Sequence, residues 1–78
     1  MRILLFAHLK DDVGQAQIEL ATGKVDSDGL WRRLIAIHPA LERFRGSVRL
    51  ARNAEYAGRD ATFSNDDEVA LIPPVSGG

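Results

Sequence analysis

The 78 residues suffice for a single domain, because a chain this short buries only about 60% of the surface that its unfolded form exposes. The net charge of −1 excludes a global field that would draw the chain onto nucleic acid or an anionic membrane. The lack of cysteine excludes disulfides, thiolate nucleophiles and thiolate metal ligands. The longest apolar run, residues 3–7, is far shorter than the roughly 20 residues that cross a bilayer, so we expect a cytoplasmic protein that does not enter a membrane.

The first part of the chain predicts two strands. Residues 3–7 form a near-continuous apolar run, which is typical of a strand buried on both faces. Residues 11–14 have turn chemistry, since aspartate makes local hydrogen bonds and Gly14 tolerates positive φ. Residues 15–20 alternate between polar and apolar side chains, so they predict a half-buried strand that forms a hairpin with the first.

A helix follows a loop at residues 22–26. Ser27 is a suitable N-cap for this helix, because its hydroxyl can accept a hydrogen bond from a free backbone N–H. Pro39 should end the helix near residue 37 or 38, or begin a short second turn through residues 41–44. The apolar stripe at helical spacing consists of Leu30, Trp31, Leu34, Ile35, Ile37 and Leu41.

The second half of the chain returns to strand signals. Its predicted elements are a strand at 48–51, a turn-rich segment at 53–60, a minor strand at 61–63, a turn at 64–67 and a last strand at 68–72. Pro73 and Pro74 stop the last strand, because neither has an N–H to donate to a ladder.

A single helix is too little to cover both faces of a sheet. The order of elements therefore predicts an α+β fold, with a mixed sheet of four to five strands and one main helix packed across one face. We expect residues 1–72 to form this domain and residues 73–78 to form an extended, flexible C-terminal tail.

No constellation of side chains predicts an active site. His8 and His38 are far apart in the sequence, and His38 is better explained as a capping or surface residue. Residues 66–68 are acidic, but consecutive positions on a turn do not point the same way, so a solvated turn is favoured over a metal site. Trp31 lies in the helical pattern and is expected in the core or at an interface rather than as a base-stacking platform.

The C-terminal tail is different. The six residues from Pro73 to Gly78 can reach roughly 20 Å when fully extended. Pro73-Pro74 favours a stiff polyproline II start, and Gly77-Gly78 has no β-carbon, so the tail can enter a narrow channel. We expect the Gly78 carboxylate to be the reactive group, and the partner-binding segment to be Pro73, Pro74, Val75, Ser76 and Gly77.

The ending resembles a known family. Residues 67–78 have an acidic pair, apolar residues and then Pro-Pro-Val-Ser-Gly-Gly, which resembles the ending of the β-grasp, ubiquitin-like sulfur carriers, most closely the small subunits of molybdopterin synthase. Residues 3–7 also resemble the first strand of that family. Two positions depart from its pattern: Leu71-Ile72 stands where an aromatic residue is common, and Asp66 stands where the turn usually has glycine. Aspartate tolerates the left-handed conformation, so we expect the turn to survive.

The resemblance implies a β-grasp fold and a role in molybdenum cofactor biosynthesis. An ATP-using enzyme would adenylate the Gly78 carboxylate, and a sulfurtransferase donor would convert it to a thiocarboxylate. The tail would then enter the large subunit of the synthase, where the sulfur passes to cyclic pyranopterin monophosphate. The chain itself would hold no cofactor or metal and supply no catalytic side chain.

Two other functions stay open. The first is a sulfur carrier for thiamine or another product, although the Pro73 to Ser76 segment resembles the thiamine carriers less. The second is a ubiquitin-like modifier that is joined through Gly78 to lysines of target proteins.

Overall fold

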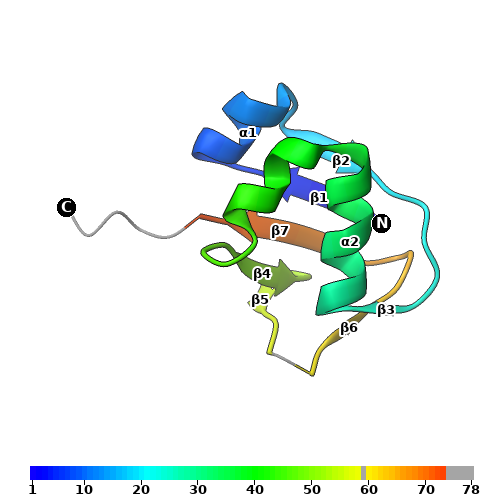
Figure 1. Ribbon diagram of the computed structural model, residues 1–78. Helices are drawn as coiled ribbons and strands as arrows, with labels where there is room; N and C mark the ends of the chain where they lie inside the picture. Colours follow the sequence, from blue (N-terminus) through cyan, green and yellow to red (C-terminus); the bar gives the residue numbers. More distant parts are fainter. Residues whose placement is uncertain (59, 74–78) are drawn as a thin grey trace.

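The computed structural model of the protein describes residues 1–58 and 60–73 (Figure 1). None of the helices in these ranges is long and apolar enough to cross a membrane. The elements in chain order are β1 (Arg2–Leu5), α1 (Ala7–Val13), β2 (Gln17–Glu19), β3 (Val25–Asp26), α2 (Ser27–Ile37), the 3₁₀ helix η1 (Pro39–Phe44), β4 (Arg49–Arg52), β5 (Glu55–Tyr56), β6 (Thr62–Phe63) and β7 (Glu68–Ile72).

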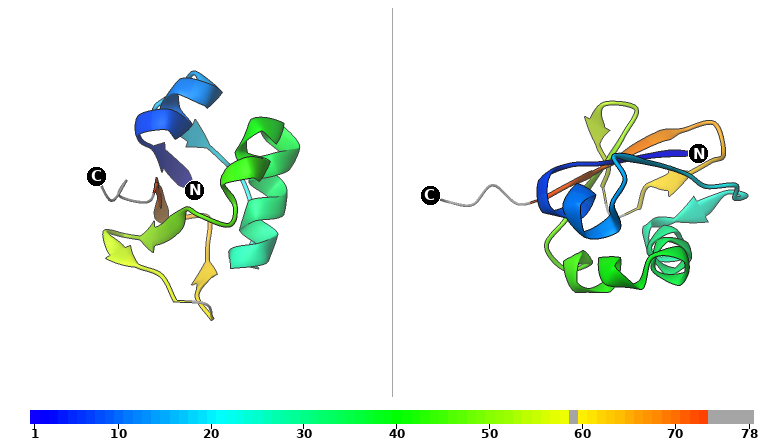
Figure 2. Two further views of the ribbon diagram at one scale, coloured as in Figure 1. Left: turned by 60° about the vertical axis from the view of Figure 1, so that its left-hand side comes forward. Right: turned by 90° about the horizontal axis from the view of Figure 1, so that it is seen from above.

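The main sheet has five strands in the order β2-β1-β7-β4-β5. The first and last strands, β1 and β7, are parallel neighbours, and the other pairs are antiparallel. The strands β3 and β6 form a separate two-stranded sheet. The helices α2 and η1 lie on one side of the main sheet (Figure 2). The predicted α+β architecture, a mixed sheet with the main helix across one face, is therefore confirmed.

Burial along β1 alternates. Ile3 and Leu5 face the core, whereas Leu4 is half-buried on the opposite face and Phe6, just beyond the strand, is 48% exposed. The prediction that this strand is buried on both faces is wrong, because the helices cover only one face of the sheet. The apolar side chains of Leu4 and Phe6 are thus left on the face of the main sheet that no helix covers, which we call the open face.

The connection between the first two strands contains α1, which the sequence did not predict. The predicted turn at residues 11–14 is the end of this helix, and His8 lies exposed within it. Gly14 does adopt a left-handed φ of 83°, and its N–H donates to the Lys10 carbonyl at 2.8 Å. The predicted hairpin is confirmed, since β1 and β2 pair antiparallel.

The N-cap of α2 is Asp26, one residue before the predicted Ser27. The Asp26 carboxylate accepts a hydrogen bond from the Gly29 N–H at 2.7 Å. The helix ends at Ile37, and η1 begins at Pro39, where the sequence allowed a short second turn. The prediction that Ile37 belongs to the buried stripe is wrong, because this side chain is 48% exposed. The helix ends at Ile37, and Leu41 reaches the core from η1 instead.

The strands of the second half are largely as expected. The last strand, β7, spans the predicted residues 68–72, and β6 is the predicted minor strand. The strand β4 begins and ends one residue later than predicted. Two short strands were missed: β5 within the predicted turn-rich segment and β3 within the predicted loop at 22–26.

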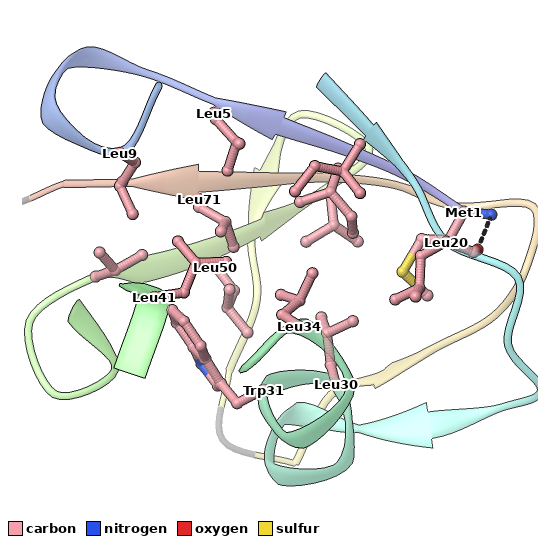
Figure 3. Packing of buried hydrophobic residues seen from close by; sticks show 14 of the residues in the cluster. Met1, Leu5, Leu9, Leu20, Leu30, Trp31, Leu34, Leu41, Leu50 and Leu71 are labelled. Carbon is pink, nitrogen blue, oxygen red and sulfur yellow. Dashed lines mark hydrogen bonds between the residues drawn. The ribbon is translucent and has the colours of Figure 1, made fainter. Parts of the chain in front are cut away.

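The core lies between the main sheet and the helices (Figure 3). Trp31 is 5% exposed and belongs to this core, as the sequence allowed. The backbone amine of Met1 donates to the Leu20 carbonyl at 2.8 Å, which closes one end of the core. The largest fully buried side chains are Phe63, Ile3, Leu9, Leu30, Leu34, Leu41, Leu71 and Val69.

Candidate functional site

The predicted reactive tail begins where β7 ends. Of its residues, the structure describes Pro73; Pro74, Val75, Ser76, Gly77 and Gly78 lie outside the described residues. The strand that leads to the tail is paired on both sides, with Leu71 opposite Leu5 of β1 and opposite Leu50 of β4. The pairing with β4 continues to Ile72, so the start of the tail is anchored at the centre of the sheet.

The open face of the sheet is divided into two ends. At the end where β1 and β7 begin, Arg2 and Glu68 are cross-strand partners and form an ion pair of 3.1 Å. Toward the end where β7 finishes, two large apolar side chains are exposed: Phe6, and Tyr56 of β5, which is 60% exposed and level with Ala70 of β7. The exposed Arg49 is the cross-strand partner of Ile72 at this end. The tail therefore leaves the sheet at the apolar end of the open face.

This apolar end contains a hollow of about 270 Å³. Tyr56 forms part of its wall, and the Arg49 guanidinium stacks over the Tyr56 ring at 4.2 Å from the centroid. Such stacking favours one orientation of the aromatic ring. The lining residues are Phe6, Ala51, Ala54, Tyr56, Ala70 and Ile72.

The sequence did not single out Phe6 or Tyr56 as site residues. Phe6 reads as a continuation of the apolar run, and Tyr56 lies in a segment with turn composition. A signal exists for Phe6, since Leu4 and Phe6 stand at alternate positions of a strand whose other face is also apolar. Such a strand on a one-sided sheet must expose apolar side chains.

The other residues considered in the sequence do not form a site. His8 is exposed on α1, and His38 is the C-cap of α2, as its predicted capping role requires; its N–H donates to the Leu34 carbonyl at 2.8 Å. Within residues 1–58 and 60–73, no three His, Cys, Asp or Glu side chains gather in a way that could hold a metal ion.

The acidic segment at 66–68 stabilises a turn instead. One Asp67 carboxylate oxygen accepts from the Ser64 N–H at 2.8 Å, and the other accepts from the Asn53 side-chain amide at 3.1 Å. The side-chain Oδ1 of Asn53 in turn accepts a hydrogen bond from the Glu68 N–H at 3.0 Å. Among the described residues, positive φ is found at Ala7, Gly14, Asn53 and Ala54, so Asp66 forms this turn without the left-handed conformation expected for it.

These bonds predict a loss of stability in acid. The hydrogen bond from the Ser64 N–H lowers the pKa of Asp67 below the ordinary 3.8, and it outweighs the opposing effect of desolvation. Because the folded-state pKa is the lower one, the stabilisation is present above pH 3.8 and is lost as the pH falls through the folded-state pKa. Urea unfolding from about pH 5 downward should therefore lose less stability in Asp67→Asn than in the wild type. Equal pH slopes for both proteins would contradict the assignment.

Comparison with known proteins gives consistent results. A model described as the ThiS family matches residues 3–78. The "Molybdopterin synthase sulfur carrier subunit" of Dictyostelium discoideum is 40% identical over 99% of this chain and 94% of its own length. The "Small archaeal modifier protein 1" of Haloferax volcanii is 35% identical over 95% of each chain. A crystal structure of SAMP1 from Haloferax volcanii superposes with a TM-score of 0.83 at 31% identity, covering 100% of this chain and 98% of that one. This likeness confirms the predicted ubiquitin-like β-grasp fold.

Proposed function

The chain belongs to the ThiS family, and on that premise we propose that it is the sulfur carrier of a molybdopterin synthase. Relatives named as the sulfur carrier subunit of that enzyme align over nearly its whole length, which supports the proposal. In this role the chain is not an enzyme by itself. It presents the sulfur atom, and the catalytic side chains belong to the large subunit of the synthase.

The observation that carries the proposal is the Gly77-Gly78 ending on a centrally anchored strand. The sequence has no cysteine, so a side-chain thiol cannot hold the sulfur. A thiocarboxylate at Gly78 could carry the sulfur instead, because it is an anionic nucleophile that requires no neighbouring base. The Pro73-Pro74 segment would aim this group away from the domain.

Formation of the thiocarboxylate requires activation. The Gly78 carboxylate attacks the α-phosphate of ATP, pyrophosphate leaves, and an acyl-adenylate forms on a separate activating enzyme. A hydrosulfide equivalent from a sulfurtransferase donor then attacks the acyl carbon, and AMP leaves. ATP is thus a substrate of the activating enzyme, and this chain itself holds no cofactor. We propose that the chain acts in the cytoplasm together with this activating enzyme.

The apolar end of the open sheet face would hold the large subunit while the tail is in the active site. Phe6 and Tyr56 are largely exposed there, and Ile72, which lines the same hollow, directly precedes Pro73. Aromatic side chains are enriched at protein interfaces because they bury a large area with few rotatable bonds. Docking at this end keeps the beginning of the tail close to the partner.

The test is the mass of the protein made together with its activating enzyme and sulfur donor. We expect an intact mass in which one oxygen is replaced by sulfur, located by fragmentation to Gly78. Protein made without the activating enzyme should have the unmodified mass. An unmodified C-terminus in both preparations would contradict the carrier function.

A second function, a protein modifier, is favoured by the 35% identity to the small archaeal modifier protein. Its signature would be isopeptide remnants of Gly78 on lysines of other proteins, found by proteomics of cells that make this chain. A carrier for thiamine or another product would also show the thiocarboxylate. It would be distinguished by sulfur transfer to a substrate other than cyclic pyranopterin monophosphate.

A further inference from the structure

A second hollow lies between the start of α2 and β4. It has a volume of about 480 Å³ and shares no lining residue with the hollow on the open face. Its walls come from α2, from Arg45 just after η1, from β4 and from the loop after β5. A smaller hollow of about 320 Å³ adjoins it, since Ser27, Trp31 and Arg45 line both. We call the larger hollow the Trp31 pocket.

The indole of Trp31 supplies a hydrogen-bond donor to this pocket. Trp31 is only 5% exposed, and its ring extends from α2 toward Leu41 and Leu50 (Figure 3). Within residues 1–58 and 60–73 the indole N–H has no acceptor, yet it is not enclosed, because Thr22 Oγ1 is the one enclosed side-chain nitrogen or oxygen there without a partner. The surface that Trp31 retains lies in the two hollows that it lines. A buried indole N–H normally finds an acceptor, so this one is available to a ligand.

Arg45 adds a positive charge that a ligand can use. Its guanidinium pairs with the Asp28 carboxylate in the first turn of α2. Asp28 also pairs with Arg32 at 3.0 Å. A ligand can therefore take a guanidinium N–H of Arg45 without leaving the Asp28 carboxylate unpaired.

The start of α2 contributes further donors. The Asp26 carboxylate accepts from the Gly29 N–H, but the N–H groups of Ser27 and Asp28 precede any acceptor within the helix. The helix dipole places a partial positive charge at this end. Ser27 lines the Trp31 pocket, and its hydroxyl can donate as well. An indole N–H, a guanidinium and a helix start thus meet at one hollow.

The charges around the pocket favour an anion. In the part of the chain that the structure describes, no Asp or Glu lines the Trp31 pocket, whereas Asp26 and Asp28 line the adjoining hollow. The segment 27–52 contains six arginines and only two acidic residues. An anionic group is therefore attracted to the Trp31 pocket and repelled from the adjoining hollow.

The size and the apolar walls indicate an organic molecule. A volume of about 480 Å³ lies within the roughly 300–1,000 Å³ that is typical of small-molecule sites. This exceeds the space that a bare anion needs. The apolar side chains of Val48, Leu50 and Ala57 line the pocket beside the donors. They would contact the carbon skeleton of a ligand whose anionic group binds to Arg45.

We propose that the Trp31 pocket binds a small organic oxyanion, a carboxylate or a phosphate monoester. The Trp31 indole N–H, the Arg45 guanidinium and the start of α2 hold the anionic group, and the apolar walls contact the rest of the ligand. The site is independent of the proposed carrier function, because it involves neither the C-terminal tail nor the open face.

The first test observes the indole directly. The chain has one tryptophan, so a nitrogen–proton correlation NMR spectrum contains a single indole resonance. Titration with phenyl phosphate and, separately, with benzoate should move this resonance downfield until it saturates, with a dissociation constant of about 1 mM or lower for at least one of them, the affinity of about two charge-assisted hydrogen bonds. Sodium chloride at equal ionic strength should leave the resonance in place.

Arg45→Gln and Arg33→Gln form a matched pair of variants. Both remove one exposed positive charge, but Arg33, on α2, does not line the pocket. Arg45→Gln should weaken binding of the phenyl compounds about tenfold or more, the loss expected for one charge-assisted hydrogen bond. Arg33→Gln should bind like the wild type. Both should keep the wild-type melting temperature, because exposed ion pairs stabilise little.

Inorganic phosphate tests the apolar walls. It should bind about fivefold more weakly than phenyl phosphate, the difference expected from burying roughly 40 Å² of apolar surface. Saturation by phenyl phosphate alone assigns the pocket to phosphate esters, and saturation by benzoate alone assigns it to carboxylates.

Three results would overturn the site. They are an indole resonance that neither phenyl compound moves to saturation, equal losses of affinity in the two arginine variants, and inorganic phosphate that binds as tightly as phenyl phosphate. None of these measurements involves Gly78, so the carrier function would stand after any of them.

Discussion

Leu34→Ala should lower the free energy of unfolding by about 2–5 kcal/mol, because it removes a fully buried side chain from the middle of α2. Leu34 is 0% exposed and packs in the layer between the helix and the main sheet (Figure 3). Truncation of Leu34 leaves a cavity that the strands cannot fill without breaking the hydrogen bonds between them. Urea unfolding at neutral pH measures the change directly.

Ile37→Ala is the matched control for this prediction. Ile37 lies in the same helix but is 48% exposed, so its truncation should change stability much less than that of Leu34. At a temperature where Leu34→Ala is still folded, thiocarboxylation should continue, because α2 supplies no chemistry. Equal destabilisation by the two substitutions would mean that the face of α2 is misassigned.

The elements that the sequence predicted well are long or sharply bounded. The helix α2 has a clear apolar spacing and a proline just beyond its end, and β7 is a mostly apolar run that stops at Pro73. In contrast, α1 has seven residues, and its half-buried or buried apolar positions are Leu9 and Val13. So short a pattern does not distinguish a helix from a turn. The four-residue spacing followed by Gly14 was its detectable signal.

The missed strands β3 and β5 have only two residues each. No periodicity can be read over such a length, and their pairing with β6 and β4 is what makes them strands. The partner of β3 lies far along the chain, so that pairing follows only from the complete fold. The partner of β5 is adjacent in the chain, but Ala54 stands in their turn where glycine is strongly preferred, so the usual hairpin signal is missing.

The C-terminal tail and the hollow on the open face also differ in how well the sequence predicts them. The chemistry proposed for the tail was inferred from local sequence, because two prolines followed by two terminal glycines are visible without knowledge of the fold. The hollow depends on the register of four strands that bring Phe6, Ala70, Ala51 and Tyr56 together. Apolar residues of an interface and of a core look alike in a sequence, and only the placement of the helices on one face separates them.

Deletion of Gly78 should abolish both thiocarboxylation and molybdopterin synthesis. The carboxylate would then belong to Gly77 and would end about 3.3–3.6 Å short of its place in the partner active sites. A misplacement of only about 1 Å can cost a hundredfold in rate, so a whole residue should leave no detectable product. The measurements are the intact mass after coexpression with the activating enzyme, and molybdopterin formed with the purified large subunit.

The stability of the deleted protein is the internal control. The strand β7 ends at Ile72, so removing Gly78 should leave the melting temperature unchanged, and any loss of activity then reflects chemistry rather than folding. A variant lengthened by one glycine after Gly78 should fail equally, because a tail that is too long misplaces the terminal carboxylate as much as one that is too short. If the deleted protein still supported molybdoenzyme activity in cells, the carrier roles for molybdopterin and for other products would fall together, since both depend on the Gly78 carboxylate.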